Sequence, residues 1–152
     1  MLSWLLACSS GPVSHDMDSA PSAPPSPLAD VVQVEVSGEA EQWVLSVTVR
    51  SPDTGCDQYA DWWEVLDADG TLRYRRILNH SHVDEQPFTR SGGPVPVGGD
   101  DALIVRAHLS PDGYGGAAMS GTASGGFVAA DVDADFAASV ASDAPQPDGC
   151  AY

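Results

Sequence analysis

Apolar residues that occupy every second position constrain the fold of this chain more than any other feature. Successive side chains of an extended strand point to opposite faces, so this alternation predicts strands with one buried face. Such strands pair into antiparallel sheets whose other face is solvated. Two segments show the pattern best, and the residues expected to share a face are Val32, Val34 and Val36 in the first and Trp43, Leu45, Val47 and Val49 in the second.

A hairpin is predicted where residues 61–66 and 71–78 flank Asp67-Ala68-Asp69-Gly70. Gly70 can adopt the left-handed backbone conformation that a short turn needs. Short strands with turn signals about every 8–12 residues predict an all-β, antiparallel sandwich of immunoglobulin or fibronectin type. A small antiparallel barrel would leave the same pattern. Further strands are expected at 83–89, 102–109 and 117–122.

One short helix is expected near the C-terminus. Val132, Phe136 and Val140 recur every four residues, and Asp133 and Asp135 lie where the N-terminus of a helix favours negative charge. The predicted helix ends before Pro145.

Charge excludes one class of partner. The 152 residues include six Arg, no Lys and 22 acidic residues, for a formal charge of −16. Such a surface repels phosphate backbones, so we expect no nucleic-acid binding. A hydrophobic content of 43% is sufficient for the core of one domain. No apolar run reaches the roughly 18 residues of a membrane-spanning helix.

The residues Leu5-Leu6-Ala7-Cys8 carry a resemblance to a known class. They resemble the lipobox of bacterial lipoproteins, in which small and apolar residues directly precede a cysteine. The resemblance implies that residues 1–7 are the remnant of a signal peptide and that Cys8 carries diacylglycerol and palmitate-type acyl chains. It further implies an address in the bacterial cell envelope, at the outer membrane or the cell surface.

A spacer is expected between this cysteine and the folded part. Residues 9–29 contain five Pro among Ser, Ala, Gly and Asp. Such a composition offers too little apolar surface to fold and makes a semi-rigid tether. The predicted organisation is therefore a lipidated, disordered tether over 8–29 and a sandwich domain over 30–152.

The cysteine count agrees with this address. Lipidation of Cys8 leaves Cys56 and Cys150 as an even pair. In an oxidising compartment, two cysteines in Gly- and Asp-rich loops are expected to form a disulfide. Two unpaired thiols are the alternative.

Three histidines of the globular part form a candidate metal site. If residues 78–84 are extended, His80 and His82 point to the same side about 7 Å apart, which suits two ligands of one metal. His108 ends another predicted strand, and Glu85 could add a carboxylate. Zinc or copper would suit these ligands. The alternative is a polar loop whose imidazoles bond to backbone carbonyls.

Aromatic residues suggest a second candidate surface. Tyr59, Trp62 and Trp63 lie together, and adjacent Trp residues on a strand face opposite ways. One ring is therefore expected to enter the core and the other to be at least half exposed, where it could stack on a sugar or a partner's side chain. The alternative is that both rings cover the faces of the sheet.

Arginines are concentrated on one predicted strand. Arg73 and Arg75 share a face and are expected to pair with Glu64 or Asp61 across the hairpin, as a solvated ion-pair ladder. The alternative for these arginines is an anion site.

Catalytic motifs are absent from the sequence. It contains no Gly-x-Ser-x-Gly elbow and no glycine loop in a strand-to-helix context. The leading hypothesis is a monomeric, envelope-anchored module with a structural or binding role toward a protein or glycan. The alternative is a metal-binding protein or small metalloenzyme that uses His80, His82 and His108.

Overall fold

A computed structural model describes residues 26–151 of the chain, and these are almost entirely strands and loops. The predicted signal-peptide remnant, Cys8 and nearly all of the predicted tether lie outside the described residues. The elements in chain order are β1 (Asp30–Ser37), β2 (Trp43–Arg50), β3 (Tyr59–Asp67), β4 (Leu72–Ile77), β5 (Phe88–Val95), β6 (Leu103–Ser110), β7 (Ala118–Thr122), β8 (Gly126–Ala130) and the 3-10 helix η1 (Ala138–Ser142).

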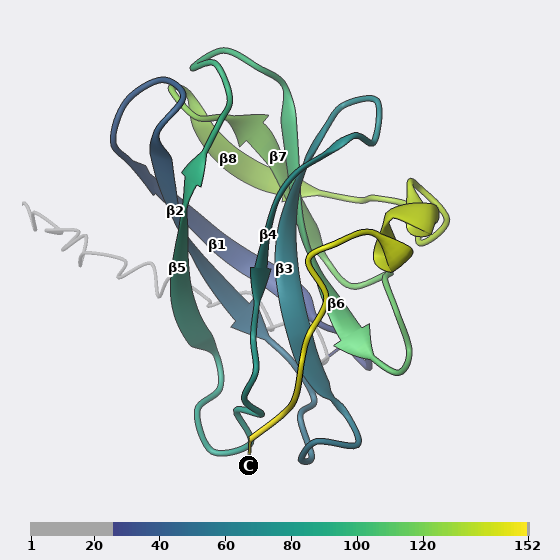
Figure 1. Ribbon diagram of the computed structural model, residues 1–152. Coiled ribbons are helices and arrows are strands. Elements are labelled where there is room, and N and C mark those ends of the chain that lie inside the picture. Colours follow the sequence, from purple (N-terminus) through teal and green to yellow (C-terminus); the bar gives the residue numbers. More distant parts are fainter. Residues whose placement is uncertain (1–25, 152) are drawn as a thin grey trace, which may run out of the picture.

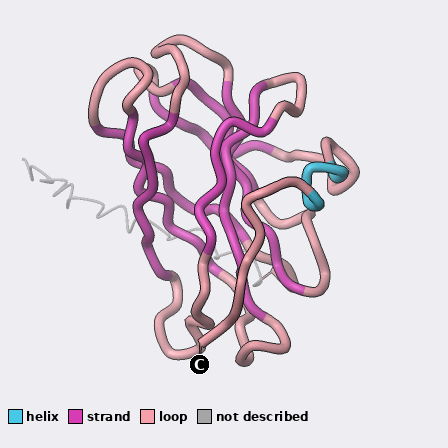
Figure 2. The backbone as a smooth tube through the Cα atoms, in the orientation of Figure 1, coloured by secondary structure: helices cyan, strands magenta, loops and turns pink. Residues whose placement is uncertain are grey.

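The strands form two antiparallel sheets that pack face to face (Figures 1 and 2). One sheet has the order β1-β2-β5 and the other the order β4-β3-β6-β7-β8. The all-β sandwich predicted from the sequence is confirmed, and the closed barrel, which was the alternative, is not formed.

The core lies between the sheets and follows from the alternation. In β2, Leu45, Val47 and Val49 have no exposed surface. They contact the inward-facing residues of the larger sheet, so the alternation correctly predicted which face of β2 is buried. Those residues include Trp63 and Val65 of β3 and Leu103, Val105, Ala107 and Leu109 of β6.

A β-bulge changes the inward face of β1. Val31 pairs with Val49 and Gln33 with Thr48, so Val32 is an extra residue without a partner. Val31 is 2% exposed, whereas Val32 is 36% exposed. The prediction that Val32 shares the buried face of Val34 and Val36 is therefore wrong.

The predicted hairpin of β3 and β4 is present. The Asp67 N–H donates to the carbonyl of Thr71, and Gly70 has a φ of +89°. β6 and β7 also lie where the alternation predicts them.

β5 lies further along the chain than predicted. Residues 83–87 form a turn, and the strand continues through Gly92 and Gly93. Gly92 is required there by packing. A Cβ there would lie 2.6 Å from the Tyr74 hydroxyl and 3.0 Å from the Trp63 ring.

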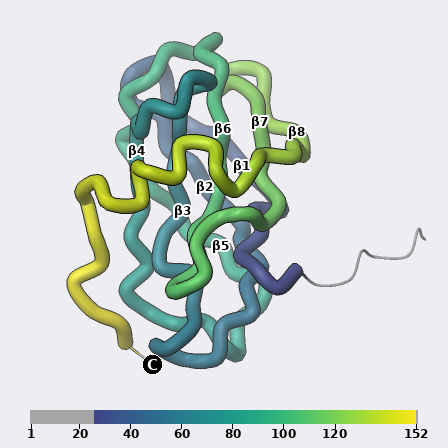
Figure 3. The backbone as a smooth tube through the Cα atoms, turned by 90° about the vertical axis from the view of Figure 1, so that its right-hand side faces the viewer, coloured from purple at the N-terminus to yellow at the C-terminus, as the bar shows by residue number. Residues whose placement is uncertain are grey.

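The C-terminal segment, defined as residues 131–151, crosses the outer face of the larger sheet, and Figure 3 looks onto this face. Its helical part is the single 3-10 helix η1 of five residues, shorter than the predicted helix and later in the chain. Ala137, just before η1, has a left-handed φ of 46°, which interrupts the helix that the spacing of Phe136 and Val140 suggested.

Candidate functional site

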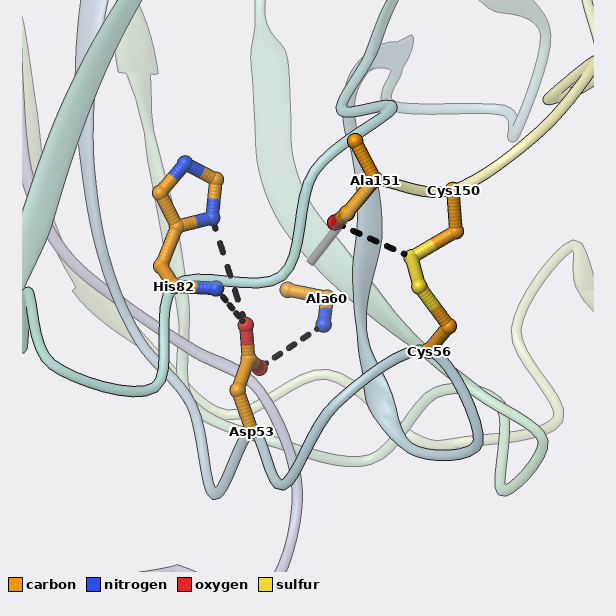
Figure 4. Close-up of a disulfide and its surroundings, with 6 residues drawn as sticks. All are labelled: Asp53, Cys56, Ala60, His82, Cys150 and Ala151. Carbon is orange, nitrogen blue, oxygen red and sulfur yellow. Dashed lines mark hydrogen bonds and ion pairs between the residues drawn. A yellow bond between two sulfur atoms is a disulfide. The ribbon is translucent and has the colours of Figure 1, made fainter.

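Three segments meet at one end of the sandwich, joined by a disulfide and by backbone hydrogen bonds. Cys56, in the loop 51–58, is bonded to Cys150 of the C-terminal segment (Figure 4). Next to it, the Ala151 N–H donates to the carbonyl of Asn79, and the Ala151 carbonyl accepts from Ser81. The predicted disulfide is confirmed: it attaches the C-terminal segment to the loop 51–58, and the backbone hydrogen bonds of Ala151 attach the same segment to the loop 78–87.

A buried carboxylate organises the same end. Asp53 Oδ1 accepts hydrogen bonds from the Ala60 N–H at 2.9 Å and from the Ser51 hydroxyl. Its other oxygen, Oδ2, accepts the His82 N–H at 2.8 Å (Figure 4). Because the side chain of Asp53 is fully buried, these donors replace the water that it has lost. This role of Asp53 was not predicted, since the residue lies in a loop with no sequence pattern around it.

His82 is held in one orientation beneath this loop. Its ring stacks on Phe88 with centroids 3.8 Å apart, and the residue is 4% exposed. Its Nδ1 lies 3.9 Å from Asp53 Oδ2 and has no hydrogen-bond partner among residues 26–151. Burial, and secondly the positive charge of Arg90, lower the pKa of His82, so the ring is neutral at neutral pH.

Two adjoining hollows lie around His80 and His82. The larger, of about 360 Å³, is lined by residues 80–85. The smaller, of about 240 Å³, is lined by residues 76–80, His82 and Arg90. His80 is exposed and lies edge-on to His82, with ring centroids 5.2 Å apart. We call the two hollows together the His80 cleft, and it is the candidate binding site of the domain.

The predicted metal ligands do not assemble. His108 stacks on Trp62 on the outer face of the larger sheet, and its Nδ1 lies 2.6 Å from Asp61 Oδ1. Both carboxylate oxygens of Glu85 accept hydrogen bonds from Arg90, at 2.7 and 3.2 Å. Within residues 26–151, no three His, Cys, Asp or Glu side chains are arranged to hold a metal ion.

The aromatic surface is covered as well. Trp63 lies in the core, and Trp62 faces outward, as the alternation predicts, yet their exposed fractions are 0% and 3%. The expectation of a half-exposed ring is wrong because His108 stacks on one side of Trp62 and the Arg75 guanidinium lies 4.4 Å from its centroid. Tyr59 is also buried, at 5%.

A buried ion cluster lies beside Trp62, and we call Glu64, Arg75 and Arg106 the Glu64 cluster. The strand register places Arg75 and Arg106 directly opposite Glu64, one on each neighbouring strand. Arg75 donates to Glu64 Oε2 from Nε and Nη2 at 2.9 and 2.7 Å, and Arg106 Nε donates to Oε1 at 2.9 Å. The Arg75–Glu64 pair was foreseen, but as a solvated pair. Arg73 instead pairs with Asp67.

The C-terminal segment covers this cluster with backbone carbonyls. Arg106 donates to the carbonyls of Phe136 and Ala137. Arg75 donates to three further carbonyls, those of Val140, Asp143 and Pro145. These acceptors satisfy the guanidinium donors that Glu64 leaves free, which allows both arginines to be buried.

Tyr114 completes the covered surface. The Arg106 guanidinium lies 3.6 Å from the centroid of its ring, and the ring contacts His108 edge-on. Burial, and secondly the negative charge of Glu64, raise the pKa of Tyr114 to about 12. Tyr114 is therefore a neutral packing residue at any physiological pH.

Comparison with known proteins gives one relative. A curated protein of Halomicrobium mukohataei, named "Putative lipoprotein", is 40% identical to this chain over 92 residues. The matched part is 60% of this chain and 44% of that protein, so the chain spans less than half of the relative's length. No family model and no solved structure matches.

The relative's name supports the interpretation of this chain as a lipoprotein. Among residues 26–151, no helix has the length and apolarity that a membrane span requires.

Proposed function

We propose that the chain is a lipid-anchored protein of the cell envelope whose sandwich domain is a non-enzymatic binding or structural module. The observation that carries the proposal is the sequence Leu5-Leu6-Ala7-Cys8 ahead of a Pro-rich spacer and a folded domain. The relative's name supports it, and so does the disulfide between Cys56 and Cys150, which suits an oxidising compartment.

The buried carboxylates of the domain have structural roles, which supports a binding or structural module rather than an enzyme. Glu64 is held by two arginines, and Asp53 is held by Ala60, Ser51 and His82. Both carboxylates are fully buried and already bonded to protein donors, so neither is open to a substrate. The His80 cleft is where a partner would bind.

The anchoring test uses the full chain expressed in a bacterial host that is fed a labelled fatty acid. The protein should take up the label and enter the detergent phase on phase separation. Cys8→Ala should lose the label and remain in the aqueous phase, because the sulfur that carries the lipid is gone. Ser9→Ala, the matched control, should behave as the unaltered chain. An unlabelled protein, or equal partition of Cys8→Ala and the unaltered chain, would refute the anchor.

A further inference from the structure

Basic side chains gather at one place on a strongly acidic protein. The smaller hollow of the His80 cleft is lined by two guanidinium groups, from Arg76 and Arg90, and by two imidazoles, from His80 and His82. The whole chain has only six Arg and four His against 22 acidic residues. Four of these ten basic groups therefore surround one hollow of about 240 Å³.

Arg76 brings a positive charge that no carboxylate neutralises among residues 26–151. Its Nε donates to the Ser91 carbonyl and its Nη1 to the Ile77 carbonyl, both at 3.1 Å. Backbone acceptors fix the guanidinium without cancelling its charge. Arg73, on the same strand, differs because it is paired with Asp67 at 3.3 Å.

Arg90 is held in a different way, at the border of the two hollows. Glu85 accepts two hydrogen bonds from it, and the guanidinium lies 5.6 Å from the centroid of the Phe88 ring. Glu85 lines only the larger hollow, so it approaches Arg90 from that side. Glu85 is thus a resident carboxylate whose removal would free the Arg90 fork.

His82 forms a buried wall that the two hollows share. The side chain is 3% exposed and the ring lines both hollows, while its Nδ1 faces Asp53 Oδ2 at 3.9 Å and has no hydrogen-bond partner among residues 26–151. Burial lowers the pKa of His82 most, and Arg90 lowers it further, so the ring is neutral at neutral pH. The charge that faces a ligand in the smaller hollow therefore comes from the two arginines.

We propose that the smaller hollow of the His80 cleft binds one oxyanion group, a carboxylate or a phosphate, with Arg76 and Arg90 as its charge partners. A guanidinium fork matches both kinds of oxyanion with paired N–H donors. The larger hollow, which shares His80 and His82, takes the part of the ligand that carries the oxyanion. This inference rests on the proposed binding role of the domain and assigns it a ligand class.

The test is a calorimetric titration of the full chain carrying Cys8→Ala, at low ionic strength, with sodium phosphate and separately with sodium acetate. Saturable binding of at least one of the two anions at a single site is expected. Arg76→Gln should weaken it about tenfold or more, because it removes a charge-assisted pair. Glu85→Gln should strengthen it, because a resident carboxylate then no longer neutralises the charge of Arg90. Arg73→Gln, the control on the same strand, should leave it unchanged.

The two anions distinguish the sources of the oxyanion, since tighter binding of phosphate or of acetate identifies the matching group. Arg76→Lys should bind with intermediate affinity, which separates loss of charge from loss of fold, and a thermal melt of each variant checks the fold. Failure of both anions to bind by about 10 mM, or equal affinity of the Arg76→Gln and unaltered chains, overturns the proposal. The fatty-acid labelling of Cys8 is independent of all these outcomes, so failure of the anchor and failure of the cleft are distinguishable.

Discussion

At the scale of single residues, the outer face of the larger sheet is ordered by charge. Glu64 has no exposed surface, and its two partners are 5% and 3% exposed. Taking three charged groups from water costs free energy that only close pairing and complete hydrogen bonding offset. The cluster therefore stabilises the fold only while every member is present.

Glu64→Gln is expected to lower the free energy of unfolding by about 3–5 kcal/mol, because it leaves two buried guanidinium groups without a counter-charge. The midpoint of urea unfolding measures this change. Glu85→Gln is the matched control, since Glu85 is exposed and pairs with Arg90 at the surface, and it should leave the midpoint nearly unchanged. Equal midpoints for the two variants would show that the cluster does not carry the stability assigned to it.

His82 gives the fold a defined response to acid. Its pKa lies below the usual value of about 6.5, so the unfolded chain binds a proton at this residue more readily than the folded chain does. Neutral His82 therefore makes its full contribution to the free energy of unfolding above about pH 6.5, and this contribution decreases as the pH falls below that value. His82→Gln should show a shallower loss of urea midpoint between about pH 7.5 and 5 than the unaltered chain. His80→Gln changes an exposed ring and should keep the original slope, and an unchanged slope for His82→Gln would contradict the argument.

At the scale of elements, the C-terminal segment is held by unusual means. η1 has only Val140 as a buried residue, so hydrophobic contact contributes little to its attachment. The segment is fixed instead by five backbone carbonyls that accept from Arg75 and Arg106 and by the disulfide at Cys150.

The double variant Cys56→Ser, Cys150→Ser should lose about 4–5 kcal/mol of unfolding free energy, because the bond closes a loop with a sequence separation of 94. Amide hydrogen exchange should rise first in residues 138–151, while β3 and β6 remain protected. Asn79→Ala is the control, as it removes a side-chain contact with Asp148 at the same end and leaves the bond in place. Uniform exchange across the domain in the double variant would show that the segment and the sheets unfold as one unit.

The elements also show what the sequence could predict. Alternation was enough for β2 and β6, where each residue faces the side that its parity assigns. It failed at Val32, because a bulge adds a residue to one strand only, and a bulge depends on the partner strand. It failed for β5, in which Gly92 is required by the rings of Trp63 and Tyr74, and for β8, whose residues Gly126–Ala130 do not alternate.

Two features near the candidate site could be predicted from the sequence: the disulfide, and the pairing of Glu64 with Arg75 across the hairpin of β3 and β4. The pairing of Cys56 and Cys150 followed from the cysteine count. The three histidines do not meet, because His108 faces the outside of the larger sheet, whereas His82 stacks on Phe88 of the smaller one. No sequence pattern reports which face a distant strand presents. The burial of Trp62 depends on His108 and Arg75, which lie on the two strands paired with β3, and local periodicity does not encode that pairing.

At the scale of the whole molecule, acidic side chains dominate the charge: the formal charge of the chain is −16, and two of its six arginines are buried in the Glu64 cluster. Exposed like charges repel one another, and this repulsion weakens the compact state. Salt shortens the range of the repulsion, from about 30 Å at 0.01 M to about 3 Å at 1 M.

Raising sodium chloride from about 0.01 M to 1 M should therefore raise the urea midpoint of the domain. The triple variant Asp57→Asn, Asp100→Asn, Asp112→Asn removes three exposed charges and should gain less from the same salt. Sodium chloride is preferred to sulfate, which also strengthens apolar burial. A midpoint that is independent of salt would show that the acidic side chains are too far apart to destabilise the fold.

The disulfide between Cys56 and Cys150 also decides how the domain responds to mechanical tension. If the chain is pulled from residues before Asp30 and from residues after Cys150, the load passes through the two sulfur atoms to Cys56 and from there toward β2 and β1. The chain between the two cysteines then bears no load, and its sequence separation of 94 is removed from the length that can be stretched. At about 3.4 Å per extended residue, the bond shortens the fully stretched chain by roughly 300 Å. The intact bond thus confines stretching to residues 30–56, and its reduction would convert a short, stiff connection into a long, compliant one.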